Sequence, residues 1–140
     1  MRKLSYLFLF ILLVGCAKSI SKENLPKLNG YWEIEKVVFP DGSTKDYSIN
    51  PVVDYVQVEG FLGFRKKVQP KFDGTYDTSN DAEPFSIVEI EERFYMLYDN
   101  DLSKWREQIL ALEDDYFSVV NQDGLQYDYR RFEPISAEKK

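Results

Sequence analysis

Short apolar and aromatic segments recur along the chain between turn residues, and this rhythm constrains the fold more than any other feature. The segments follow one another every 8 to 12 residues or so, which is typical of an antiparallel sandwich or barrel. Turns are marked by Pro40-Asp41-Gly42, Asp73-Gly74 and Asp123-Gly124. Only residues 101–112 could compete as a helix. The expected strands are residues 31–39, 45–49, 52–59, 61–69, 71–78, 85–91, 94–99, 105–112, 116–121 and 125–133.

Alternation of side chains within these segments indicates how they face the core. In the last segment Leu125, Tyr127 and Tyr129 share one face. The first segment is partly apolar on both faces, which suits a barrel with something packed outside it. Residues 109–112 are four apolar residues in a row, so this strand is either buried on both sides or bulged. Because the connections are short, we expect an all-β, up-and-down meander that closes into a barrel of about eight strands.

The N-terminus has the pattern of a bacterial lipoprotein signal peptide. Arg2 and Lys3 precede an apolar run over residues 4–14, and Leu13-Val14-Gly15 leads into Cys16. The run is shorter than the roughly 20 residues of a transmembrane helix. Cys16 is the single cysteine of the chain and stands where a lipobox requires it, so we expect it to carry acyl chains such as palmitate and to anchor the protein in a membrane.

This pattern divides the chain into four parts. We expect a signal peptide over residues 1–15, a lipidated tether over 16–28, one domain over 29–135 and a polar tail over 136–140. Without Arg2 and Lys3, 16 Lys and Arg face 24 Asp and Glu, a net charge of −8. So acidic a surface argues against a nucleic-acid partner and against close contact with anionic lipid.

Three features of the domain carry a family likeness. Gly30-Tyr31-Trp32 opens the first strand, Phe72-Asp73-Gly74-Thr75-Tyr76 lies mid-chain, and basic residues lie in the last strand. Together with the meander they resemble the lipocalin-like lipoproteins of Bacteroidota. The resemblance implies that Gly30 and Trp32 belong to a barrel-closing motif, in which Trp32 plugs one end and Arg131 lies across its indole. It also implies a bacterial outer-membrane location. No acidic run follows Cys16 as in the surface-export signals of these bacteria, so we expect the protein to face the periplasm.

The residue inventory restricts the chemistry. The chain has no histidine, and its one cysteine is assigned to the anchor, which excludes a Ser-His-Asp triad, a Cys-His dyad and a histidine metal site. Carboxylate pairs such as Glu91 and Glu92 are more simply solvated turn tips. Residues 99–110 fail the calcium-loop pattern, and residues 77–83 form a plain polar connection more readily than a calcium site. We therefore expect no enzyme activity, no cofactor and no metal.

A basic cluster, Arg65-Lys66-Lys67, stands out in this acidic chain. It is either a patch for an anionic ligand or a solvated strand edge that discourages aggregation. The second interpretation is favoured, because charged residues commonly protect exposed edges.

The barrel interior is the sharper candidate for a binding site. An eight-stranded barrel either holds one small ligand or is filled by side chains, and the sequence leaves both open. Parity places six aromatic side chains there as ligand-binding candidates: Tyr55, Phe64, Tyr76, Tyr95, Tyr127 and Tyr129. The leading hypothesis is a carrier or sensor of a small, largely apolar ligand in the cell envelope. The alternative is a non-enzymatic interaction protein with a filled barrel, an envelope-assembly accessory or an inhibitor, whose acidic loops 77–83 and 99–104 dock on a basic envelope protein.

Overall fold

The computed structural model describes residues 20–48, 50–78 and 81–133, which form one short helix and ten strands. The elements are η1 (Lys22–Leu28), β1 (Gly30–Val38), β2 (Thr44–Asp46), β3 (Val53–Glu59), β4 (Leu62–Pro70), β5 (Tyr76–Thr78), β6 (Glu83–Ile90), β7 (Arg93–Asp99), β8 (Lys104–Leu112), β9 (Tyr116–Asn121) and β10 (Gln126–Arg131). Within these residues no helix has the length and apolar character needed to span a membrane. Cys16, the signal peptide and the 136–140 tail lie outside the described residues.

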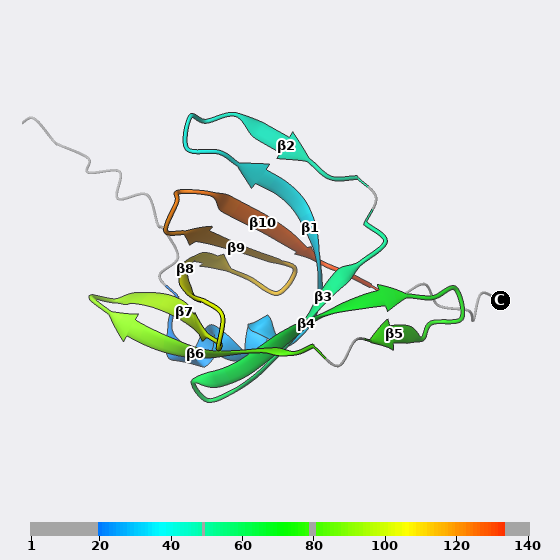
Figure 1. Cartoon of the computed structure of the whole chain (residues 1–140), viewed down its shortest axis with the longest axis horizontal. Coiled ribbons are helices and arrows are strands. Elements are labelled where there is room, and N and C mark those ends of the chain that lie inside the picture. Colours follow the sequence, from blue (N-terminus) through cyan, green and yellow to red (C-terminus); the bar gives the residue numbers. More distant parts are fainter. Residues whose placement is uncertain (1–19, 49, 79–80, 134–140) are drawn as a thin grey trace, which may run out of the picture.

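The strands form a closed antiparallel barrel (Figure 1). The order runs β1-β3-β4-β6-β7-β8-β9-β10, and β10 pairs back onto β1 from Trp32↔Arg131 to Val38↔Gln126. β2 pairs with the end of β1, and β5 folds back on β4 beside the ring. Closure pairs every strand of the eight-stranded ring on both sides, whereas β2 and β5 each pair on one side.

The predicted fold class, an all-β meander closed into a lipocalin-like barrel, is confirmed. Two elements differ from expectation. The strand expected over 71–78 is reduced to Tyr76–Thr78, because Lys71 to Thr75 form a turn in which the Lys71 N–H donates to the Thr75 carbonyl. Residues 101–112 are not helical, since β8 begins at Lys104 and its ladder with β7 and β9 satisfies the backbone.

Two bulges explain the irregular alternation in the sequence. The register between β1 and β10 shifts between Ile34 and Lys36, so Ile34 opposes Tyr129 and Val37 opposes Tyr127 on the same inner face. A second shift between Ile109 and Ala111 turns Leu110 outward, where it is 41 % exposed. Four consecutive apolar residues therefore fit a strand with only one buried face.

One end of the barrel is plugged by apolar side chains. Leu25 and Leu28 of η1 are buried in the same core cluster as Trp32, Met96 and Phe117. The tether expected over 16–28 is therefore too long, because residues 22–28 belong to the domain. The sequence does not predict this burial, because the segment is otherwise polar. Its two leucines, three residues apart, share a face only when the chain forms a 3-10 helix.

Candidate binding site at the barrel mouth

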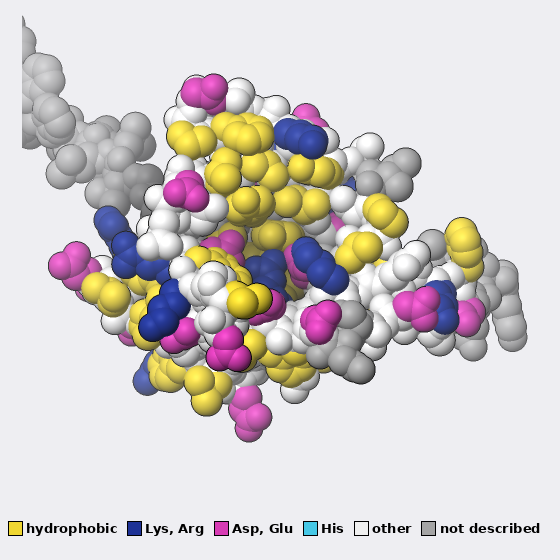
Figure 2. All heavy atoms as spheres, viewed as in Figure 1, with side chains coloured by type: hydrophobic (Ala, Val, Ile, Leu, Met, Phe, Trp, Pro, Cys, Tyr) yellow, Lys and Arg dark blue, Asp and Glu magenta, His cyan; other side chains and the backbone are white. Residues whose placement is uncertain are grey.

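The end of the barrel opposite η1 is hollow. A cavity of about 510 Å³ opens where β7, β8, β9 and β10 begin or end, close to Tyr98, Trp105, Asn121 and Tyr127. Figure 2 shows this opening, with hydrophobic side chains along one wall and basic and acidic side chains at its base. The barrel is therefore neither fully hollow nor fully filled. Its closed half is an apolar core and its open half is a pocket.

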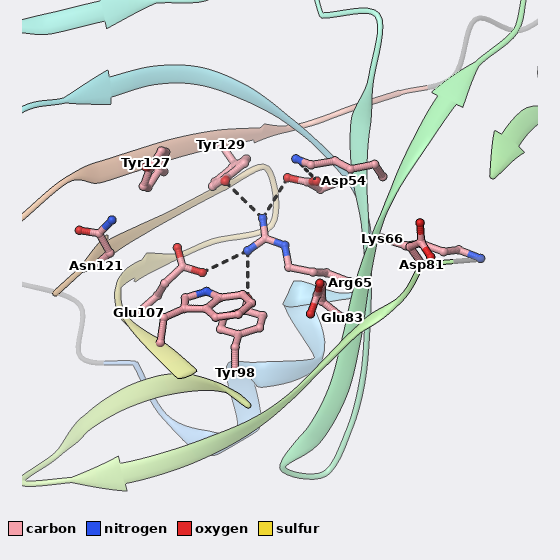
Figure 3. A pocket seen from close by; sticks show the side chains of 12 residues that line it. Asp54, Arg65, Lys66, Asp81, Glu83, Tyr98, Glu107, Asn121, Tyr127 and Tyr129 are labelled. Carbon is pink, nitrogen blue, oxygen red and sulfur yellow. Dashed lines mark hydrogen bonds and ion pairs between the residues drawn. The ribbon is translucent and has the colours of Figure 1, made fainter. Parts of the chain in front are cut away.

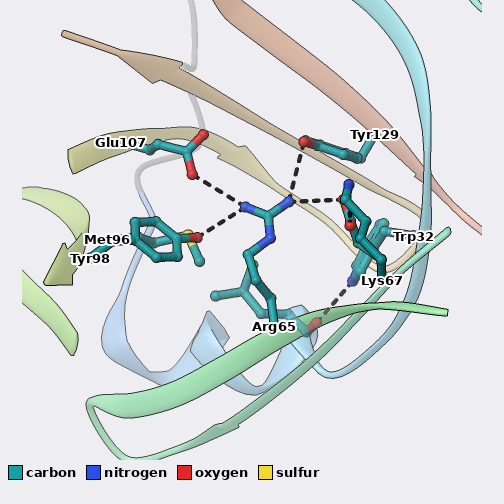
Figure 4. Close-up of polar contacts among 9 residues, drawn as sticks. Trp32, Arg65, Lys67, Met96, Tyr98, Glu107 and Tyr129 are labelled. Atoms are coloured by element: carbon teal, nitrogen blue, oxygen red, sulfur yellow. Dashed lines mark hydrogen bonds and ion pairs between the residues drawn. The ribbon is translucent and has the colours of Figure 1, made fainter. Parts of the chain in front are cut away.

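Arg65 of β4 lies at the base of this pocket and is surrounded by acceptors. Its Nη1 donates to the Tyr98 hydroxyl (2.9 Å) and to Glu107 Oε1 (3.2 Å). Its Nη2 donates to Asp54 Oδ2 (2.9 Å) and to the Tyr129 hydroxyl (3.2 Å). The four partners come from β3, β7, β8 and β10, so one guanidinium ties together strands from all around the barrel (Figure 4).

The charges in this network are almost fully removed from water. The Arg65 side chain is 14 % exposed, and those of Asp54 and Glu107 are 4 % and 8 % exposed. Burial of a lone charge is costly, but direct pairing and hydrogen bonds offset much of that cost. Lys67 of β4 adds a second cation, with its Nζ 2.5 Å from Asp54 Oδ1 and its side chain mostly in solvent.

The two tyrosines of the network are held in the protonated form. Burial raises the pKa of Tyr129 to about 12, although the neighbouring Arg65 opposes the shift. Burial also raises the pKa of Tyr98 well above its usual value, and Arg65 again acts in the opposite direction. Both hydroxyls therefore remain neutral near pH 7 and accept hydrogen bonds from the guanidinium.

Aromatic rings form the walls above this base. Tyr98 stacks on Trp105 with ring centroids 4.7 Å apart and the planes 4° from parallel. Tyr129 stacks on Phe117 at 4.6 Å, and Tyr127, the preceding inward residue of β10, lines the pocket. The pocket thus combines flat apolar walls with a few fixed polar groups, as small-molecule sites usually do.

Only two of the six predicted ligand-binding aromatics reach this pocket. Tyr127 and Tyr129 line it, as the alternation of the last strand predicts. The placement of Tyr55, Phe64, Tyr76 and Tyr95 inside the barrel is wrong. Tyr55 and Phe64 alternate with the inward Asp54 and Arg65, and so they project outward.

Tyr76 and Tyr95 also lie outside the barrel. Tyr76 belongs to β5, which is beside the ring, and stacks on Tyr31 with centroids 4.2 Å apart. Tyr55 continues this outer aromatic cluster, 4.9 Å from Tyr31. Tyr95 alternates with the buried Phe94 and Met96 and lies beneath the outward Arg106.

The basic cluster is divided between the two faces of β4. Lys66 points outward, with its Nζ 5.8 Å from the Tyr55 ring centroid. Arg65 points inward, which corrects the interpretation of the whole cluster as a solvated edge. The sequence did not predict that Asp54, Tyr98, Trp105, Glu107 and Asn121 would line the pocket. For Arg65 the sequence signal was parity along β4, where an apolar-inside rule turns Phe64 inward instead.

Trp32 and Arg131 close the opposite end. The Arg131 Cζ lies 4.1 Å from the Trp32 ring centroid, and Trp32 is fully buried. The Trp32 Nε1 donates to the Leu28 carbonyl (2.8 Å), while Arg131 donates to the carbonyls of Asn29 and Lys27 at 2.7 Å each. Gly30 has φ +126°, and a Cβ there would collide with Arg131 Nη1. These three residues have the arrangement that the resemblance implied.

Across residues 20–48, 50–78 and 81–133, the structure has no group of three or more Asp, Glu, Cys or His side chains placed to hold a metal ion.

No protein-family model matches the sequence, and neither does a curated protein. Among solved structures, a lipocalin-like protein from Bacteroides uniformis ATCC 8492 shares 12 % identity, with a TM-score of 0.48 over 76 % of this chain and 99 % of that one. The strand order, the β1–β10 closure and the Trp32–Arg131 plug by themselves describe a lipocalin-like barrel, open at one end.

Proposed function

We propose that this protein binds a small, largely apolar molecule in the mouth of its barrel, as a carrier or sensor in the cell envelope. The observation that carries the proposal is the cavity of about 510 Å³ walled by Tyr98, Trp105 and Tyr127 above a polar base. Its volume lies within the range of about 300–1,000 Å³ typical of ligand pockets. A hollow mouth also supports this function over the alternative of a filled barrel that acts only through its loops.

Nothing in the proposal requires catalysis. The residue inventory offers no histidine or cysteine nucleophile to the pocket, and the buried carboxylates are engaged with Arg65. The protein is therefore proposed to be a binding protein and not an enzyme.

The proposed anchor is a lipid on Cys16, in the outer membrane and facing the periplasm. Ile20 packs against the core beside Lys27 and Arg131, so the chain enters the domain at the closed end. Three residues lie between Cys16 and Ile20, so the two Cα atoms are four steps apart and at most about 14 Å from each other. A lipid there would hold the closed end near the bilayer and leave the mouth open to the aqueous side.

Native mass spectrometry of the chain from Ala17 onward, purified gently from its own host, tests ligand binding. This form retains Ile20 and everything after it, so it keeps the whole core cluster. We expect a small co-purifying mass that Tyr127→Ala removes and that Tyr95→Ala, a matched change on the outer face, retains. A mass that survives Tyr127→Ala would contradict binding at the mouth.

Metabolic labelling with a palmitate analogue tests the anchor. The intact chain should be labelled and sediment with membranes, and Cys16→Ser should lose both properties while its barrel stays folded. Label retained in Cys16→Ser would place the lipid elsewhere and contradict this part of the proposal.

A further inference from the structure

The base of the mouth carries a charge pattern that selects among ligands. Resting on the binding role above, we infer that the ligand carries a protonated amine, which Glu107 receives at the base while the apolar part lies between the aromatic walls. The argument follows from which polar groups at the base are already used and which remain open to a ligand.

The two terminal nitrogens of Arg65 are not available to an anionic ligand. Each of these nitrogens has two donor hydrogens, and each already donates to two acceptors of the protein. A ligand carboxylate or phosphate would have to displace Asp54, Glu107 or a tyrosine hydroxyl, and would then lie beside a buried carboxylate. The guanidinium therefore stabilises the site, and its terminal nitrogens offer no free donor to an anionic ligand group.

Two cations, Arg65 and Lys67, meet two carboxylates at the base, and the carboxylates share these cations unequally. Two buried carboxylates, Asp54 and Glu107, contact one buried guanidinium. The second cation, Lys67, pairs with Asp54, and its side chain is 70 % exposed. Among residues 20–48, 50–78 and 81–133, Glu107 has one cationic partner, Arg65, which it shares with Asp54. A ligand cation beside Glu107 would give this carboxylate a second cationic partner, as Asp54 already has in Lys67.

Glu107 also has an oxygen that faces the cavity. Arg65 engages Oε1, and Figure 3 shows the other carboxylate oxygen directed away from Arg65, on the side where Tyr127 and Asn121 lie. All three residues line the same pocket. The negative charge of Glu107 is felt at Tyr127, because burial raises the pKa of the Tyr127 hydroxyl and the Glu107 carboxylate raises it further. A ligand ammonium placed here would form a charge-assisted hydrogen bond.

The aromatic and acidic residues of the pocket wall also favour a positively charged ligand group. Trp105 and Tyr127 line the pocket together with Glu107, and an aromatic face attracts a cation, while the Tyr98 ring is already stacked on Trp105. Asp81 and Glu83 add negative charge to the pocket lining, whereas Lys66, the remaining cation there, lies over the outer Tyr55 ring. The site thus combines an apolar slot with a lining of four carboxylates and three cations.

A set of ligands that differ only in the head group tests the inference on the unaltered protein from Ala17 onward. Trp105 is at the mouth and Trp32, the other tryptophan, is fully buried at the closed end, so fluorescence quenching reports mouth binding. Decylamine, decanol and decanoate are titrated at pH 7, with neutral N-phenyl-1-naphthylamine as a probe of the apolar slot. We expect decylamine to bind at least about tenfold more tightly than decanoate, with decanol between them.

The outcomes separate the inference from the proposed function. Binding of the neutral probe together with equal or tighter binding of decanoate would overturn the inference and leave the proposed function standing. If neither the probe nor any of the three ligands binds, both fail.

Replacement of Glu107 tests whether its negative charge binds the ligand ammonium. Glu107→Gln keeps an acceptor for Arg65 but removes the negative charge, so decylamine should bind about tenfold more weakly and decanol should be unaffected. Glu59→Gln, an exposed change at the β3–β4 hairpin of the closed end, is the matched control and should leave both affinities unchanged. Equal decylamine affinity in folded Glu107→Gln and the parent would overturn the assignment. If this variant does not fold, the head-group comparison decides.

Discussion

Asp54 Oδ2 lies 2.9 Å from Arg65 Nη2 inside the barrel, although the alternation of β4 by itself would turn Phe64 inward instead of Arg65. On β3 the inner face carries Asp54 together with the buried Val56 and Val58, whereas the aromatic Tyr55 projects outward. The pairing of Asp54 with Arg65 fixes the base of the ligand pocket, so the stability of the barrel and the shape of the site depend on one guanidinium.

Removal of the guanidinium should destabilise the barrel strongly. Arg65→Leu would remove the guanidinium that pairs with the buried Glu107 and leave Asp54 with Lys67 alone, and we expect the free energy of unfolding to fall by about 3–5 kcal/mol. Urea denaturation followed by circular dichroism measures it. Arg130→Leu is the control, because Arg130 pairs with Glu33 on the outer face and is 45 % exposed. That change should cost about 1 kcal/mol or less. Equal losses for the two variants would contradict the structural role of Arg65.

Gly30 should be required because of Arg131. Both Gly30→Ala and Gly42→Ala place a side chain at positive φ, but a Cβ at Gly42 meets nothing within 4 Å whereas one at Gly30 collides with Arg131. We expect Gly42→Ala to cost about 1–2 kcal/mol and Gly30→Ala about 3 kcal/mol or more, measured by chemical denaturation.

A double variant separates the collision from the backbone strain. In an Arg131→Ala background the Gly30→Ala change should cost no more than Gly42→Ala does, because only the positive φ remains. An undiminished cost would show that the close contact is irrelevant.

The turn between β6 and β7 stores backbone strain. Glu91 and Glu92 have φ of 52° and 65°, a conformation that suits Asn-Gly in a two-residue hairpin. Replacement of Glu91-Glu92 by Asn-Gly should raise the free energy of unfolding by about 1 kcal/mol or more. A Gln-Gln replacement removes the same charges but keeps the strain, so thermal unfolding should show little gain. If Gln-Gln stabilised as much as Asn-Gly, charge repulsion would be the cause.

Stability should decline at high pH because of the buried tyrosines. The pKa of Tyr129 is raised from 10.0 to about 12, and that of Tyr98 is also raised, in both cases chiefly by burial. Above pH 10 the unfolded chain releases these protons while the folded chain keeps them. The stabilisation is thus complete below pH 10 and is lost as the pH rises from 10 toward 12.

Each buried tyrosine should contribute a slope of about 1.4 kcal/mol per pH unit in that window. Urea unfolding at intervals between pH 9 and 11.5 measures the slope, and Tyr129→Phe should flatten it even though it also removes an acceptor from Arg65. Tyr95→Phe on the outer face is the control. An unchanged slope in Tyr129→Phe would show that this hydroxyl titrates normally.

Local patterns in the sequence determined much of the fold. Spacing, turn pairs and short connections predicted the all-β meander, because hairpins depend on neighbouring residues. The Gly30-Tyr31-Trp32 motif, through its resemblance, located the closed end. Even the bulge in β8 was open to prediction, since four consecutive apolar residues at 109–112 cannot all face one side of a regular strand.

Only the tertiary structure decided which face of β3 and β4 points inward, and with it the binding site. A shift of one residue exchanges the faces of a strand, and no local signal distinguishes an inward Arg65 from an inward Phe64. The choice depends on partners contributed by Asp54, Tyr98, Glu107 and Tyr129, from four different strands. A buried charge is acceptable only where such partners converge, and their convergence exists only in the closed barrel.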